Sequence, residues 1–180
     1  MAAVAIARPA PDEYVPYYAL YVNQVPEGDV LGLLRRQVQE TAGMVQSLSD
    51  HDAQYRYEEG KWSIKEVIGH VSDTERIFAY RALCFARGEA ASLPGFDENE
   101  YARRSNAGSR PLRPLVDELR AVREATLSFF SGLTEELLLR RGTANRNGYS
   151  VRAIAFIIAG HERHHARIIV ERYLPGLKQR

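Results

Sequence analysis

The sequence is poor in cysteine and lysine, and neither sign of charge is in excess. Its single cysteine, Cys84, has no partner within the chain, which excludes a disulfide framework and is typical of a reducing compartment. Lysine occurs only at positions 61, 65 and 178. The formal net charge of the 180 residues is +1, whereas proteins whose main task is nucleic-acid binding usually carry a strong basic excess. We therefore expect no nucleic-acid partner.

Long apolar runs are also missing. No run approaches the roughly 18 residues that a membrane span needs, and the N-terminal MAAVAIARPAPDEY is interrupted by Arg8 and Pro9 before it could form the apolar region of a signal peptide. We expect no membrane association and a cytoplasmic location. With 45% hydrophobic and 26% charged residues, the composition is that of an ordinary globular protein, and the length suits a single domain over residues 1–180.

Strand patterns are scarce, and helical periodicity dominates. Four segments place apolar residues three and four apart, as an amphipathic helix requires: residues 29–49, 63–87, 112–132 and 151–173. The second segment opens with a Ser63-x-x-Glu66 capping box and stops at Gly88. Shorter helices are expected at 97–104 and 135–140, and 141–149 reads as a turn-rich loop or a short extended excursion. These features predict an all-α four-helix bundle.

Two segments outside the long helices have their own character. Residues 1–28 are rich in proline and tyrosine, and we expect an ordered arm packed on the bundle. Residues 89–111 form a long connection between the second and third helices, either a cover over a site or a plain crossover linker. On the third helix, the charged residues Asp117, Glu118, Arg120, Arg123 and Glu124 are expected to form a solvated face.

The last helix carries two histidines within its apolar half. At about 100° per residue, His161 and His165 fall among the isoleucines of that half. Buried polar groups cost free energy unless they have a partner, and residues four apart project to one point. A shared metal ion therefore explains both rings.

A third histidine, His70, lies on the apolar arc of the second helix. A lone histidine in such a place is commonly a hydrogen-bonded core residue, but packing of the two helices can bring all three rings to one level. Three neutral imidazoles with an open fourth position are typical of a catalytic divalent site. We predict that His70, His161 and His165 bind a divalent ion, which could be zinc, nickel, iron or manganese.

The motif His161-Glu162-x-x-His165 formally matches the H-E-x-x-H signature of zinc peptidases. Such peptidases take their third ligand from downstream, where this chain has no further histidine, so we discount peptidase activity. Glu162 lies on the inner arc and is a candidate acid/base group beside the metal. Three further residues are candidates for substrate binding: His164 at the edge of this arc, and Glu75 and Arg81 on the second helix. For each of them, ordinary packing or ion pairing is left open.

The chain resembles the DinB/YfiT-like superfamily of metalloenzymes over nearly its whole length. The resemblance is carried by KWSIKEVIGHVSDTERIFAYRAL, by LPGFDENEY and by IAGHERHHARIIVERYL, and most specifically by one histidine on the second helix followed by H-x-x-x-H on the last. It implies a four-helix bundle with a three-histidine divalent metal site at His70, His161 and His165. Many members of the superfamily are dimers, so a homodimer is expected.

The resemblance also implies possible reactions. Members with known activity include thiol S-transferases that use low-molecular-weight thiols such as bacillithiol or mycothiol, so a thiol-dependent transferase acting on a small electrophile is the first expectation. From the residues alone, a hydrolase using metal-bound hydroxide is equally consistent with the ligand set. A non-catalytic metal-binding protein of the stress response is the third alternative.

Overall fold

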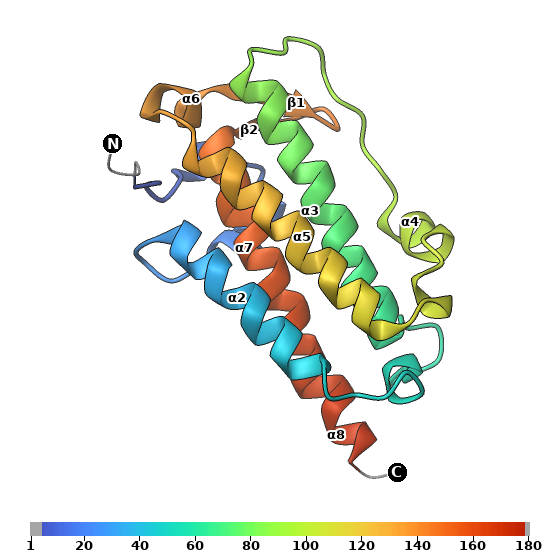
Figure 1. Ribbon diagram of the computed structural model, residues 1–180. Coiled ribbons are helices and arrows are strands. Elements are labelled where there is room, and N and C mark those ends of the chain that lie inside the picture. The colour runs from blue at the N-terminus through green and yellow to red at the C-terminus, as the bar shows by residue number, and fades with distance from the viewer. Residues whose placement is uncertain (1–4, 179–180) are drawn as a thin grey trace.

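The computed structural model describes residues 5–178, which form a bundle of four long helices (Figure 1). These helices are α2 (Val30–Val45), α3 (Ile64–Ala86), α5 (Leu112–Ser131) and α7 (Val151–Ile168). Figure 1 shows α2 and α7 running in one direction and α3 and α5 in the other. The predicted all-α four-helix bundle is confirmed.

The two helices that carry the histidines begin where their capping residues predict. At the start of α3, Ser63 Oγ accepts a hydrogen bond from the Glu66 N–H at 3.3 Å, and the Glu66 carboxylate accepts from the Ser63 N–H at 2.7 Å. At the start of α7, Ser150 Oγ accepts from the Ala153 N–H at 3.0 Å. These caps satisfy backbone donors that a helix terminus leaves unpaired, and they fix which residues face the interior.

The connection between α3 and α5 crosses the length of the bundle, because the two helices run parallel (Figure 1). It contains α4 (Glu98–Arg104) and a 3-10 turn at Ala107–Ser109. Asp97 caps α4 by accepting from the backbone N–H groups of residues 99 and 100. The connection lies close against α3, since a Cβ atom added to Gly69 would lie 2.8 Å from the Cβ of Ala107.

The N-terminal arm packs on α7, as expected for the residues that the structure describes; residues 1–4 lie outside them. It forms two 3-10 turns, Pro11–Glu13 and Pro16–Tyr18, followed by the short helix α1 (Ala19–Val22). A Cβ atom on Gly160 would lie only 2.1 Å from the carbonyl oxygen of Tyr21. Gly160 falls outside the apolar half of α7, and its lack of a side chain lets the arm cover that surface.

The segment before α7 forms a hairpin. After α6 (Glu135–Leu139), strands β1 (Arg141–Ala144) and β2 (Asn147–Ser150) pair antiparallel, with residue 141 opposite residue 150. The tight turn between them places Asn145 and Arg146 at φ values of +50° and +63°. Of the two interpretations of residues 141–149, the extended one is therefore confirmed. Leu93 of the crossover joins the hairpin by accepting from the Asn145 N–H and donating to the Thr143 carbonyl, both at 2.9 Å.

The C-terminal end differs from the prediction. The last helix was predicted over residues 151–173, but α7 continues through a π-helical turn, Ile169–Tyr173, into α8 (Leu174–Leu177). Pro175 lies in the first turn of α8. Within residues 5–178, no helix combines the length and apolarity that a membrane crossing requires.

The bundle core consists of two apolar clusters with a buried polar layer between them. One cluster lies under the arm and the hairpin, and the other lies around the opposite end of α3 and α5. The polar layer contains buried side chains from all four long helices: Gln37, Thr41, His70, Thr74, Glu75, Arg123, Thr126, His161 and Glu162. Such a layer is costly unless its groups are paired with one another or with a ligand.

Candidate metal centre

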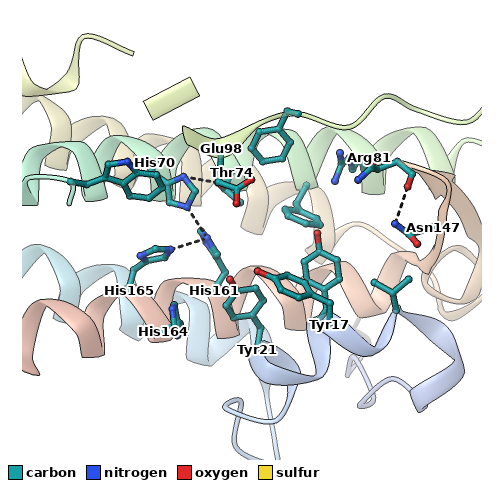
Figure 2. Close-up of a pocket in the computed structure, with 16 residues that line it drawn as sticks. Tyr17, Tyr21, His70, Thr74, Arg81, Glu98, Asn147, His161, His164 and His165 are labelled. Carbon is teal, nitrogen blue, oxygen red and sulfur yellow. Dashed lines mark hydrogen bonds between the residues drawn. The ribbon is translucent and has the colours of Figure 1, made fainter. Parts of the chain in front are cut away.

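Three imidazoles converge at the α3–α7 interface (Figure 2). His70 comes from α3, and His161 and His165 come from adjacent turns of α7. The Nε2 atom of His161 lies 3.1 Å from Nε2 of His70 and 3.1 Å from Nε2 of His165. One ring nitrogen from each residue lies within 4.8 Å of the other two. The structure thus brings together the three histidines that the sequence indicated.

Burial keeps these rings neutral. His70 and His161 are only 6% and 7% exposed. Desolvation lowers the pKa of His70 to about 4. It lowers the pKa of His161 and His165 well below the usual value, and the neighbouring imidazoles lower both further. Near pH 7 each ring therefore carries a lone pair on one nitrogen, which is the state that binds a metal ion.

Hydrogen bonding among the rings cannot account for their arrangement. A neutral imidazole has one N–H donor and one acceptor nitrogen, so Nε2 of His161 can form a good hydrogen bond with only one of the two Nε2 atoms beside it. The other contact sets two nitrogens against each other without a proton between them. Two imidazoles bound to one zinc ion at the usual bond length hold their nitrogens roughly 3.3 Å apart, close to the observed 3.1 Å. The three residues therefore fit a divalent ion.

The histidines lie on the wall of a cavity of about 530 Å³. Aromatic side chains from the arm, α3 and the crossover form much of its lining. The lining residues are Val15, Tyr17, Tyr18, Tyr21, Trp62, His70, Thr74, Phe78, Arg81, Phe96, Glu98, Asn145, Asn147, His161, His164 and His165. Figure 2 shows the three histidines toward one end and Arg81 toward the other. A site open to a cavity of this size has room for a small-molecule substrate.

Comparison with known proteins gives the family. The model of the DinB superfamily matches residues 33–169, which include all three histidines and most of the bundle. The chain belongs to the DinB superfamily. A protein of Oceanobacillus iheyensis with the name putative metal-dependent hydrolase is 29% identical over 122 residues, covering 67% of this chain and 70% of that protein.

A solved DinB-like structure has the same fold. YfiT from Bacillus subtilis, described as a probable metal-dependent hydrolase with an unusual four-helix bundle topology, superposes with a TM-score of 0.73. The match covers 86% of this chain and 89% of YfiT at 13% sequence identity. At that identity the similarity establishes the fold alone.

Two carboxylates that the sequence analysis expected at the metal site do not face the cavity. Glu75 and Glu162 are buried against Arg123 of α5, and neither lines the cavity. Arg123 donates to both oxygens of Glu75 and to Glu162, each at 2.8 Å. Glu162 also accepts a hydrogen bond from Thr41 at 2.8 Å. Glu75 thus forms the ion pair that was left open for it, and Glu162 is paired with the same arginine. A substrate-binding role for Glu75 and an acid/base role for Glu162 stay predictions.

The prediction for Arg123 itself was wrong. It was expected on a solvated face, but its side chain is completely buried. Burial by itself would lower the pKa of Arg123, but the charges and hydrogen bonds of Glu162 and Glu75 outweigh this effect and raise it. Its Nη1 donates to the Leu34 carbonyl of α2 at 2.7 Å. A single guanidinium thus links all four long helices directly beneath the histidines.

His164 and Arg81 do line the cavity, as their candidate roles require. The His164 ring packs edge-on against Tyr21, with centroids 5.5 Å apart. Trp62 packs over His70 with ring centroids 4.5 Å apart and closes one end of the site. Thr74 Oγ1 lies 3.5 Å from the second ring nitrogen of His70, where an oxygen can orient a ligating ring.

One functional candidate escaped the sequence analysis. Glu98, the first residue of α4, is the only carboxylate among the described residues that line the cavity. Its position results from the crossover, which contributes Phe96 and Glu98 to the cavity wall and so supports the cover interpretation of residues 89–111. The Asp97 cap gave a local signal for α4, but no periodic pattern could show which wall that helix would face.

Proposed function

We propose that this DinB-superfamily protein is a metal-dependent hydrolase in which His70, His161 and His165 hold one divalent ion. The observation that carries the proposal is the convergence of three neutral imidazoles on an open cavity. Among residues 5–178, no fourth histidine, cysteine or carboxylate joins the group. Structural zinc sites are closed by four protein ligands, whereas catalytic sites keep a position open. The name of the Oceanobacillus iheyensis relative supports the same reaction class.

When bound, a divalent ion supplies Lewis acidity, which allows water to be activated near neutral pH. The residues of the chain would bind the substrate and move protons. Glu98, an exposed residue that lines the cavity, would accept a proton there. Burial raises the pKa of Tyr21, and hydrogen bonding to Tyr17 raises it further, so its hydroxyl stays protonated and can donate to a substrate oxygen. Tyr21 packs edge-on against His161 with ring centroids 5.3 Å apart, which places it beside the reacting end.

The thiol S-transferase expected from the resemblance would use the same ligands and cavity, with a thiol as the nucleophile. The name of the curated relative favours hydrolysis, and the transferase stays a prediction that the same assays test. The identity of the metal, the homodimer and a role in stress response also remain predictions.

The test combines metal analysis with an activity panel. Full-length protein is loaded with zinc, nickel, manganese or iron(II) and assayed on activated esters, amides and phosphoesters, with and without small thiols. Three variants are compared. His161→Ala removes the shared ligand, Glu98→Gln removes the proposed proton acceptor, and His51→Ala removes a histidine whose side chain is 87% exposed and serves as the matched control.

We expect about one metal ion per chain in wild type, His51→Ala and Glu98→Gln, and little in His161→Ala. Hydrolysis should fall by about 10²-fold or more in Glu98→Gln with metal content unchanged, the usual effect of losing an acid/base group. Product formation that requires a thiol and yields a thioether would assign the transferase instead. Full metal loading without turnover of any substrate in the panel would count against an enzyme of either kind.

A further inference from the structure

A second charged group faces the cavity at a distance from the histidines. Arg81 lies eleven residues after His70 on α3, which corresponds to about three turns and about 16 Å of helix axis. Thr74 and Phe78 lie between them, and all four residues line the same cavity. One face of α3 therefore runs from the histidine cluster to a guanidinium, and Figure 2 shows the two at opposite ends.

Arg81 is a buried cation without an anionic partner in the part of the chain that the structure describes. The residue is 3% exposed, and its one hydrogen bond to those residues goes from Nη2 to the Pro94 carbonyl at 3.0 Å. The guanidinium otherwise lies over the rings of Phe78 and Phe96, at 5.1 and 5.7 Å from their centroids. Desolvation lowers its pKa, and the two nearby tyrosines, Tyr18 and Tyr149, oppose this effect.

Arg123, which is also deeply buried, has the anionic partners that Arg81 lacks within the described part of the chain. Arg123 has two carboxylates within 2.8 Å, whereas Arg81 forms no ion pair with any described residue. A buried charge is expensive unless a partner neutralises it, and a guanidinium has donors arranged to bind a carboxylate or phosphate with two parallel hydrogen bonds. The unpaired group lies in a cavity rather than in solid core, so a ligand can supply the partner.

We propose that Arg81 is an anion-binding subsite and that the cavity takes elongated anionic substrates, with a carboxylate or phosphate at Arg81. Five aromatic rings also line the cavity, those of Tyr17, Tyr18, Tyr21, Phe78 and Phe96, which suits an acyl chain or an aromatic body. His70 and Arg81 lie about 16 Å apart along the helix axis, which sets the length of substrate that can reach from one to the other. The position of the scissile bond at the histidines rests on the proposed function; the anion subsite does not.

The experiment measures binding to the full-length protein by isothermal titration calorimetry, with zinc bound and after chelation. The probes are octanoate, its neutral analogue octanamide, and octyl phosphate. Arg81→Met removes the charge while keeping the apolar stem, and Arg81→Lys restores a charge. Arg113→Met removes an exposed arginine of α5 and controls for net charge. Circular dichroism and the unfolding midpoint of each variant show that the fold is intact.

We expect octanoate to bind more tightly than octanamide with or without metal. Arg81→Met should weaken octanoate binding by about 10- to 100-fold, the range for losing a charge-assisted hydrogen bond, with octanamide unaffected. Arg81→Lys should recover part of the preference, and Arg113→Met should match wild type. Tighter binding of octyl phosphate would support the subsite and assign phosphate as its anion.

Two results would overturn the proposal. One is equal binding of octanoate and octanamide to wild type. The other is a preference that disappears with the metal and does not respond to Arg81→Met, because the carboxylate would then bind at the histidine site. In a separate experiment, 4-nitrophenyl monoesters of straight-chain dicarboxylic acids of different chain lengths are assayed for hydrolysis. If none is hydrolysed while the calorimetric preference persists, the proposed function fails and the anion subsite stands.

Discussion

Substitution of Arg123 by methionine should nearly unfold the protein. The guanidinium is fully buried and links α5 to Glu75 of α3, to Glu162 of α7 and to the Leu34 carbonyl of α2. Its removal leaves two carboxylates facing each other without a counter-charge in the bundle interior. Breaking one buried pair by removing a partner costs roughly 3–5 kcal/mol, so we expect a loss of at least about 4 kcal/mol. Natural domains have only about 5–15 kcal/mol of stability in total.

The assay is urea unfolding of the metal-free protein, with two comparison variants. Arg120→Met removes a half-exposed arginine of the same helix that pairs with Asp117, and its cost should stay within about 0.5 kcal/mol. The triple variant Arg123→Met, Glu75→Gln, Glu162→Gln removes all three charges. It should be more stable than Arg123→Met by about 2 kcal/mol or more, because no unpaired charge remains. If Arg123→Met and Arg120→Met have similar stabilities, the reasoning about the buried network is wrong.

Other predictions address the arm and the titration of the site. Gly160→Ala should destabilise the protein by about 1–3 kcal/mol and expose the arm to proteolysis, since the new methyl group would clash with the Tyr21 carbonyl. Gly43→Ala, with nothing within 4 Å of the added atom, should instead stabilise α2 by up to about 1 kcal/mol; equal effects of the two changes would refute the close contact. The folded-state pKa of His70 lies near 4, below the value of about 6.5 in an unfolded chain. Protonation of His70 alone should therefore cost the metal-free protein up to about 3 kcal/mol as the pH falls from 6.5 toward 4. His161 and His165, whose pKa values are also lowered, should add to this loss. His70→Gln should flatten that part of the pH profile of the urea midpoint, and an unchanged profile would contradict the burial argument.

The convergence of the histidines was predictable because local rules determine most of it. His161 and His165 are four residues apart on a helix whose apolar half is unambiguous, and a capping box and a serine N-cap fix where α3 and α7 begin. His70 lies on the apolar arc of its own helix, so packing of the two arcs brings it to the pair. These relations depend on helical geometry and burial, both of which a sequence pattern records.

The polar network and the cavity wall were not predictable, because both depend on contacts between segments that are far apart in the chain. Arg123 looks like part of a charged surface, because its partners lie 48 and 39 residues away in the chain and only the packing of α5 against α3 and α7 brings them together. Glu98 depends on the path of a crossover with no periodic pattern. Nothing in the sequence around Glu75 and Glu162 indicates the arginine that binds both.

The most direct test of the central claim is an equilibrium metal titration of wild type and His70→Ala against a competing chelator. His70 is the one ligand contributed by α3, and only the folded bundle brings it to the pair on α7. We predict one divalent ion per wild-type chain and an affinity lower by about 10²-fold or more in His70→Ala, with His51→Ala unchanged. An affinity in His70→Ala equal to that of wild type would show that the three imidazoles do not share an ion.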